Sequence, residues 1–202
     1  MRRIILLRHG VTSWNLERRF QGQTDVELSE SGVLQAKSVA AVLAAYEPSA
    51  LWSSDLLRAR ATAEIVGEAT GLTPRLDARL RETHLGELQG LTHAEAVERF
   101  GLGPYDYAEF GGERDTDVGL RFAAALTDLD ATLPQGATAL VVAHGAAIRN
   151  GLLTFLGWPI TQVGALGPLA NCGWVELTDE PTTWAQRAPW RMAAYNRVTP
   201  IS

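Results

Sequence analysis

Two apolar runs, far apart in the chain, each end in a histidine followed by a glycine. The first covers residues 4–10 and the second covers residues 139–145. An apolar run of four or five residues that ends at a glycine is typical of a buried parallel strand. Side chains at the carboxyl ends of such strands line the crevice in which α/β proteins bind ligands. We therefore expect His9 and His144, two of only four histidines in the chain, to lie in one crevice.

Strand and helix patterns alternate along the rest of the chain. Ser29 is placed to cap a helix with apolar residues on one face, and further helices are predicted at residues 55–69, 92–100 and 115–129. Short strands are predicted at residues 50–53, 73–76, 174–177 and 190–195. This alternation predicts one α/β domain over residues 1–202, with a three-layer α/β/α arrangement. Its sheet is expected to be mostly parallel, with an antiparallel edge strand from the tail.

Residues 101–114 interrupt this alternation. The segment contains four glycines, a proline and aromatic residues, a composition typical of an irregular lid. We expect a small cap around residues 90–114, in which Tyr105, Tyr107 and Phe110 either stack on a substrate or pack the lid.

Composition restricts the partners and the compartment. A net charge of −5 argues against a nucleic-acid or membrane-surface partner, but permits an anionic small substrate if positive charge is concentrated locally. Cys172 is the only cysteine, so no intramolecular disulfide can form, and a cytoplasmic location is expected. The apolar run after the N-terminal arginines is too short for a secretory signal, and no stretch approaches the roughly 20 apolar residues of a membrane span.

The first strand end carries residue types suited to a phosphate. Gly10 allows a close approach of the backbone to a ligand, and Arg8 offers a planar fork that matches phosphate oxygens. Asn15 follows at the start of the next predicted helix, whose first N–H groups favour an anion. On their own these residues also fit a capped turn with a solvent-facing Arg–His pair.

The middle of the chain adds weaker signals. Arg58 lies in the first turn of a predicted helix and can point into the same crevice, whereas Arg60 lies about 200° further round that helix. Taken alone, both arginines are more typical of an exposed surface, and so is Glu82. No spacing of histidine or cysteine predicts a metal site. Together, two histidines, clustered arginines and an acid indicate phosphoryl transfer through histidine.

Five motifs then match one family in order. They cover residues 7–10 with Thr12 and Asn15, residues 20–22, residues 53–56 with Arg58 and Thr62, residues 80–82 with Gly86, and residues 143–145. Over essentially the whole chain, this series resembles the histidine phosphatase superfamily, which has the phosphoglycerate mutase-like fold.

The resemblance implies specific roles. His9 becomes the phosphorylated nucleophile and Glu82 the proton donor to the leaving group, with Arg8, Arg58 and His144 completing the catalytic set. The implied phosphate-binding residues are Arg8, Asn15, Gln21, Gly22, Arg58, His144 and Gly145. The pocket of this family uses no metal or other cofactor. Val11 stands where many members carry Glu or Gln, which we interpret as tuning rather than inactivation.

Departures from the mutase pattern favour a phosphatase. Mutases of the family carry a tyrosine and a lysine where this chain has Leu85 and His93, and an adjacent arginine pair where it has only Arg114. The chain is similar in several stretches to the actinobacterial glucosyl-3-phosphoglycerate phosphatases, which implies a small phosphorylated sugar or glycerate substrate and a homodimer. A broad-specificity phosphatase, a cofactor-dependent mutase and a phospho-ligand sensor are the alternatives.

Overall fold

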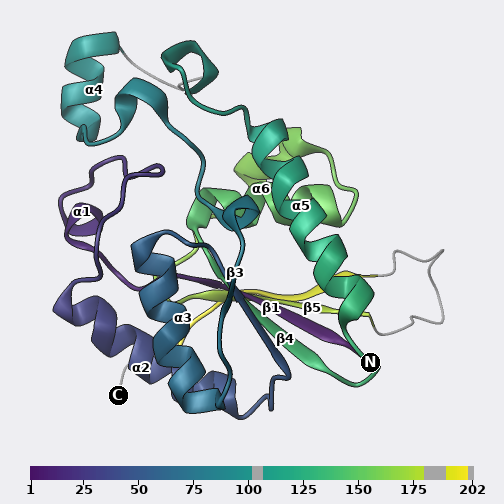
Figure 1. Cartoon of the computed structure of the whole chain (residues 1–202). Coiled ribbons are helices and arrows are strands. Elements are labelled where there is room, and N and C mark those ends of the chain that lie inside the picture. Colours follow the sequence, from purple (N-terminus) through teal and green to yellow (C-terminus); the bar gives the residue numbers. More distant parts are fainter. Residues whose placement is uncertain (102–106, 180–189, 200–202) are drawn as a thin grey trace.

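A six-stranded sheet forms the centre of the computed structural model, which describes residues 1–101, 107–179 and 190–199 (Figure 1). The strand order is β3-β2-β4-β1-β5-β6. Four strands are parallel: β1 (Arg3–Arg8), β2 (Ala50–Ser53), β3 (Arg75–Leu76) and β4 (Thr138–Ala143). β5 (Trp174–Thr178) pairs antiparallel with β1, and β6 (Arg191–Arg197) pairs antiparallel with β5. The predicted mostly parallel sheet with an antiparallel edge is therefore confirmed.

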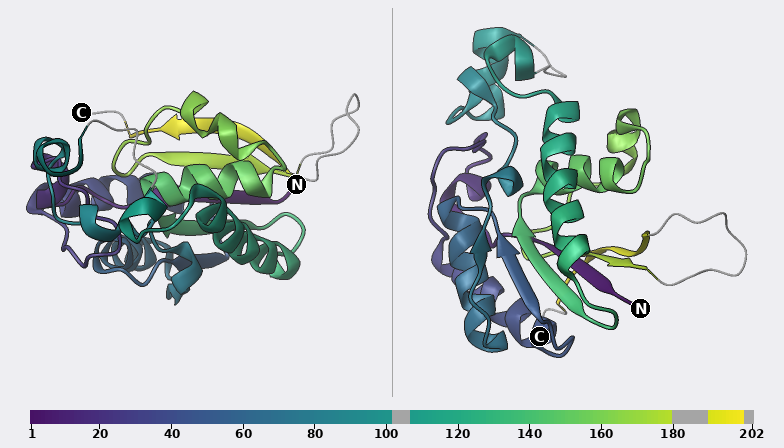
Figure 2. Two further views of the ribbon diagram at one scale, coloured as in Figure 1. Left: turned by 90° about the horizontal axis from the view of Figure 1, so that it is seen from above. Right: turned by 45° about the vertical axis from the view of Figure 1, so that its right-hand side comes forward.

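Helices cover both faces of the sheet (Figure 2). On one face α2 (Glu30–Ala44) packs against α3 (Leu57–Thr70), and on the other α5 (Asp115–Thr132) packs against α6 (Gly145–Phe155). Side chains of β1 alternate between the two cores: Ile4 and Leu6 join the α5–α6 side, while Ile5 and Leu7 join the α2–α3 side. Burial on both faces explains the continuous apolar runs of the central strands.

Capping residues explain most helix boundaries. The Ser29 hydroxyl accepts the N–H of Gly32 at 3.1 Å at the start of α2, and Gly71 ends α3 in the left-handed conformation (φ 72°). α3 begins at Leu57, two residues later than predicted, because the chain stays extended through Leu56. The helix predicted after the first strand is only the single turn α1 (Ser13–Leu16).

A cap segment lies beyond the sheet, at the top of Figure 1. It contains α4 (His93–Phe100) and the 3₁₀ turns Gly86–Leu88 and Tyr107–Phe110, which share a small apolar cluster around Leu88 and Ala96. Further 3₁₀ turns cover Ala78–Leu80 and Ile160–Ala165. Tyr105, one of the aromatic residues predicted for the cap, lies outside the described residues. Within the described ranges, none of the helices has the length and apolarity needed to cross a membrane.

Candidate active site

The two strand-end histidines lie side by side. β1 and β4 are neighbours in the sheet, with Arg8 opposite Ala143, so the residues that follow them emerge together. The ring centroids of His9 and His144 are 5.2 Å apart, with the rings tilted by 58°. Adjacency of two parallel strands thus places both imidazoles at one edge of the sheet.

The hydrogen bonds of His9 define which ring nitrogen is free to react. Its Nδ1 lies 2.7 Å from the carbonyl oxygen of Gly10, and a carbonyl can only accept, so Nδ1 carries the proton. Nε2 therefore keeps its lone pair and accepts a hydrogen bond from Arg58 Nε at 3.3 Å. This is the tautomer that a nucleophilic imidazole requires.

Burial keeps the His9 ring neutral. The side chain is only 3% exposed, and this desolvation, followed by the charges of Arg58 and Arg8, holds its pKa well below the ordinary value. The ring is thus neutral at neutral pH, with the proton on Nδ1 and the lone pair on Nε2.

Two arginines approach the ring from different elements. Arg58, on the first turn of α3, is 1% exposed and donates to the carbonyl oxygens of Gly22 and Thr24 at 2.7 and 2.9 Å. Burial lowers its pKa to about 10, so it remains charged at neutral pH. Arg8, at the end of β1, donates to the carbonyl of Leu169. Positive charge is therefore concentrated at this edge although the chain is acidic overall.

Three buried polar atoms around His9 have no hydrogen-bond partner among the described residues. They are Arg8 Nε, Thr83 Oγ1 and His144 Nδ1. The other nitrogen of His144 lies 2.9 Å from Ser54 Oγ, which fixes the orientation of the ring. Buried donors are normally paired. Unused donors beside a nucleophile are therefore suited to the oxygens of a bound anion.

Two side-chain amides at the same edge are oriented by Thr12. Its hydroxyl donates to Gln21 Oε1 at 3.1 Å, while Asn15 Oδ1 accepts the backbone N–H of Thr12 at 3.0 Å and Asn171 Nδ2 at 3.2 Å. Because the oxygens are occupied, both amide NH₂ groups are left to donate. Asn171 also donates to the carbonyl of His9 at 3.1 Å, so it links the amide pair to the nucleophile.

Glu82 lies at the N-terminus of α6. Its carboxylate accepts the backbone N–H groups of Ala147 at 2.8 Å, Ala146 at 3.2 Å and Thr83 at 2.9 Å. A negative charge at a helix N-terminus is stabilised by the unpaired N–H groups and the helix dipole. The predicted anion position at α1 is different: there the capping box of Thr12 and Asn15 occupies the N–H groups with side chains.

An arginine–glutamate pair fixes the loop that carries Glu82. Arg121, on α5, donates to the carbonyls of Arg79, Arg81 and Glu82 and forms an ion pair with Glu113 at 2.8 Å. Glu113 in turn accepts the N–H of His84 at 2.8 Å. Apart from the Arg121–Glu113 ion pair, these contacts join residues about 30 to 40 positions apart, and no sequence periodicity predicted them.

The side chains described above surround a cleft of about 190 Å³. It is lined by Arg8, His9, Asn15, Arg19, Phe20, Gln21, Gly22, Arg58, Glu82, Thr83, Leu85, Tyr107 and Ala146. Seven of the predicted site residues are in this set, whereas His144 and Gly145 lie directly behind Arg8 and His9. Sequence reasoning missed Arg19, Thr83 and Ala146, which have no distinguishing pattern. A larger groove of about 440 Å³ beside Val33 and Ala61 shares none of these residues.

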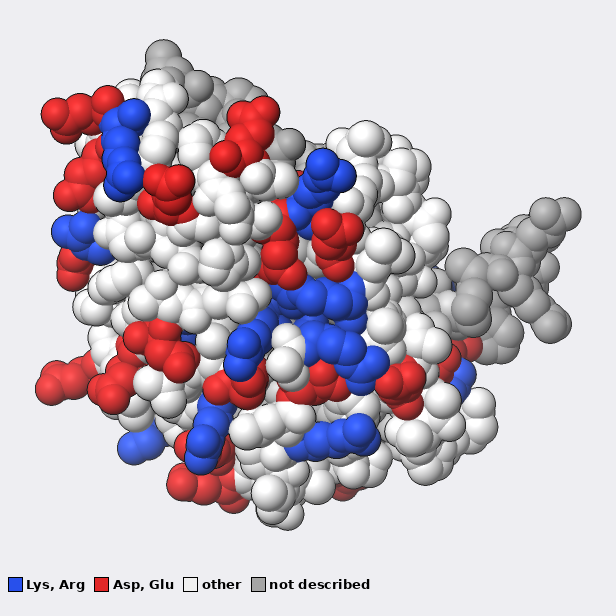
Figure 3. All heavy atoms as spheres, turned by 45° about the horizontal axis from the view of Figure 1, so that its top comes forward, with Lys and Arg blue, Asp and Glu red and all other residues white. Residues whose placement is uncertain are grey.

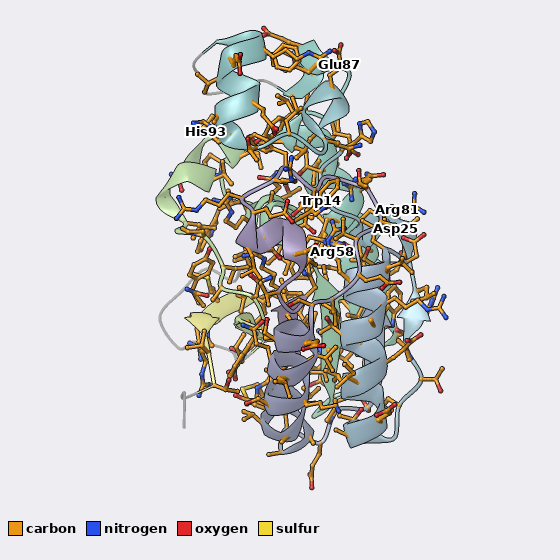
Figure 4. The ribbon with its side chains drawn as sticks, turned by 90° about the vertical axis from the view of Figure 1, so that its left-hand side faces the viewer. Trp14, Asp25, Arg58, Arg81, Glu87 and His93 are labelled. Carbon is orange, nitrogen blue, oxygen red and sulfur yellow. The ribbon has the colours of Figure 1, made fainter. Side chains whose placement is uncertain are left out.

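The structure adds a packing role to one sequence-based interpretation. A Cβ at Gly10 would lie 2.5 Å from the carbonyl oxygen of Gly32 in α2, so helix packing by itself requires a glycine here. In Figure 4, His93 and Glu87 lie in the cap, well above Arg58. His93 is therefore remote from the arginine that contacts His9. Among the described residues, no three His, Cys, Asp or Glu side chains are grouped to hold a metal ion.

Comparison with known proteins agrees with this geometry. The family model for the histidine phosphatase superfamily (branch 1) matches residues 4–189. The glucosyl-3-phosphoglycerate phosphatase of Mycobacterium tuberculosis is 38% identical over 100% of this chain and 97% of its own length. A probable phosphoglycerate mutase of Yersinia pestis is 38% identical over 91% of this chain and 88% of its own length.

Solved structures give the same family. A mycobacterial glucosyl-3-phosphoglycerate phosphatase in complex with VO3 has a TM-score of 0.86 at 38% identity, covering 97% of this chain and 99% of that chain. The family model and the relatives both extend over nearly the full length of the chain. This protein belongs to the histidine phosphatase superfamily.

Proposed function

We propose that the protein hydrolyses a phosphomonoester through a covalent phosphohistidine at His9. The observation that carries this proposal is the neutral, buried imidazole whose Nε2 lone pair lies among Arg58, Arg8 and His144. A nucleophile surrounded by cationic donors is what phosphoryl transfer requires, because stabilising the equatorial oxygens provides most of the catalysis.

The reaction then has two steps. In the first, His9 Nε2 attacks phosphorus and the bond to the leaving oxygen breaks, while the proton of the substrate's monoanionic phosphate passes through the Glu82 carboxylate to the departing alkoxide. In the second, Glu82 takes a proton from water, the hydroxide attacks the phosphohistidine, and inorganic phosphate leaves with that proton, so that His9 and the Glu82 carboxylate are restored. Arg8, Arg58 and the ring of His144 hold the phosphoryl oxygens throughout.

The remaining predicted residues bind the phosphate rather than react. The amide groups of Asn15 and Gln21 have their oxygens occupied, so their NH₂ groups are the donors for the anion. The carbonyl oxygen of Gly22 accepts a hydrogen bond from Arg58. A Cβ added at Gly145 would lie 3.5 Å from Arg8 Nε, so this glycine packs against Arg8.

Hydrolysis is favoured over mutase chemistry by the residues at the mutase positions. Leu85 lines the cleft but is apolar, His93 is exposed on α4, and Arg114 is exposed at the start of α5. A mutase must hold its substrate in two orientations through such groups, so water is the expected acceptor here. The similarity to a probable phosphoglycerate mutase keeps mutase activity as the second candidate.

The substrate that we propose is glucosyl-3-phosphoglycerate or a related sugar or glycerate phosphate. Its support is the full-length similarity to the mycobacterial phosphatases of that name. The cap over residues 90–114 would contribute to specificity, since Tyr107 both lines the cleft and packs beside the cap cluster. A homodimer and a cytoplasmic location remain predictions, which gel filtration and cell fractionation test.

The test is phosphate release from a substrate panel. The panel contains glucosyl-3-phosphoglycerate, 3-phosphoglycerate, sugar phosphates, nucleotides and phosphotyrosine, with His9→Ala as the blank. We expect a preference of about 100-fold in kcat/KM for the glucosylated acid, or about 2.7 kcal/mol of differential transition-state binding. A flat profile would indicate a broad-specificity phosphatase. Turnover by His9→Ala near the wild-type rate would overturn the phosphohistidine mechanism.

A further inference from the structure

The pairing of the arginines shows which positive charges are left for a ligand. Figure 3 shows basic side chains close to acidic ones across one face of the molecule, and such pairs include Arg81 with Asp55 and Arg79 with Asp128. Three arginines that are at least half-buried have no carboxylate within 4 Å among the described residues: Arg8, Arg58 and Arg149. A buried cation without a counter-ion is costly, so a bound anion would stabilise each of them.

Arg8 and Arg58 already have an anion in the proposed reaction, but Arg149 does not. Arg149 lies on α6, one helical turn after Ala146, which lines the cleft. Residues three apart share a helix face. Burial is the main cause of the lowered pKa of Arg8 and of the raised pKa of Tyr107, two residues that line the cleft; the positive charge of Arg149 adds to the first shift and opposes the second. Arg149 therefore lies on the face of α6 that carries Ala146, next to the residues that line the cleft but outside that set.

The guanidinium of Arg149 is anchored on one side and unused on the other. One terminal nitrogen donates to the carbonyl of Leu166 at 3.2 Å, in the same loop whose Leu169 holds Arg8. Its Nε is buried and has no partner in the described part of the chain. A held guanidinium with a free N–H edge is preorganised for a planar, singly charged acceptor.

We propose that Arg149 binds the carboxylate of a phosphorylated acid whose phosphate is held by Arg8 and Arg58. This inference rests on the proposed function and names the chemical class of its substrate: a phosphomonoester with a second anionic group. The positions that mutases use for this purpose offer no suitable cation here, because Leu85 is apolar and His93 and Arg114 are exposed. Arg149 is thus a specificity residue and takes no part in phosphoryl transfer.

The test compares two substrates that differ only in the carboxylate. 3-Phosphoglycerate carries a carboxylate where glycerol 3-phosphate carries a hydroxymethyl group. We expect the wild type to favour the acid, and Arg149→Met to lower kcat/KM for the acid by about 10- to 100-fold, the loss expected for a hydrogen-bonded charge pair. The loss should be in KM, with glycerol 3-phosphate and p-nitrophenyl phosphate unchanged. Arg114→Met is the matched control and should retain the wild-type preference.

Several results would overturn the inference. The first is a wild-type enzyme with equal kcat/KM for 3-phosphoglycerate and glycerol 3-phosphate. The second is an Arg149→Met variant that keeps the wild-type preference for the acid. The third is an equal loss of kcat/KM on both substrates, which would mean that Arg149 only supports the loop at Leu166. Arg149→Lys, which retains the charge without the fork, should give a smaller loss and serves if the methionine variant does not fold. The preference for a carboxylate can depend on Arg149 while kcat/KM is the same for glucosyl-3-phosphoglycerate and 3-phosphoglycerate. In that case only the substrate named in the proposed function is wrong. Absence of any phosphate release by the wild type would instead overturn the proposed function.

Discussion

Mild acidification should destabilise the folded protein through its two buried histidines. His9 and His144 are 3% and 0% exposed, and burial, followed by the charge of Arg58, holds the pKa of both rings well below the ordinary value. Both rings therefore stay neutral in the folded chain, whereas in the unfolded chain each binds a proton near pH 6.5. Because the unfolded state then binds more protons, the free energy of unfolding decreases as the pH falls below about 6.5.

The size of the effect follows from the unfolded state. Each ring is neutral in the folded chain and has a pKa of about 6.5 in the unfolded chain. Lowering the pH from 7.5 to 5.5 therefore decreases the free energy of unfolding by about 1.4 kcal/mol for each ring. The two rings together cost about 2.7 kcal/mol, a substantial part of the roughly 5–15 kcal/mol that stabilises most domains. The salt-bridged carboxylates Asp55 and Asp77, whose pKa is lowered by Arg81 and Arg79, contribute only at more acidic pH.

Urea unfolding followed by tryptophan fluorescence measures this change. The buffers must be free of phosphate, since a bound anion would stabilise the folded state. His144→Gln should reduce the loss to about 1.4 kcal/mol, because only one buried ring remains. The wild type and the variant should still differ in how much free energy of unfolding they lose at low pH when the salt concentration is high, since salt screens buried groups poorly. An identical loss in the wild type and the variant would refute the reasoning.

Two further predictions concern catalysis. Glu82→Gln should slow hydrolysis of sugar or glycerate phosphates by about 100- to 10,000-fold, the range for loss of a general acid. Hydrolysis of p-nitrophenyl phosphate should slow much less, because its leaving group needs little protonation. Equal losses in steady-state assays of both substrates would exclude Glu82 as the proton donor. Chelators such as EDTA should leave kcat/KM unchanged in the same assay, and inhibition that added zinc or magnesium reverses would exclude a metal-free reaction.

Some of the site could be predicted because its signals are local. The buried strand before His9 and the one before His144 are continuous apolar runs, since each is covered on both faces. The caps at Ser29 and Gly71 are single-residue signals with a direct chemical reason.

Other parts of the site have no local signal. Glu82 lies in a loop without periodicity, and its carboxylate is positioned by α6, more than 60 residues away. The signal at Gly10 is local, because glycine permits a close backbone contact, but its contact with Gly32 of α2 has no local signal. Residue type indicated what these positions could do, and long-range packing decided what they contact.

The sequence by itself determined the α/β class, the alternation of strands and helices, and the chemical types available for phosphoryl transfer. These follow from local periodicity and side-chain chemistry. Only the tertiary structure decided that β1 lies beside β4, that Nε2 is the free nitrogen of His9, and that Arg149 has no acidic partner among the described residues. Strand order, ring tautomer and charge pairing depend on residues far apart in the chain, which no local pattern records.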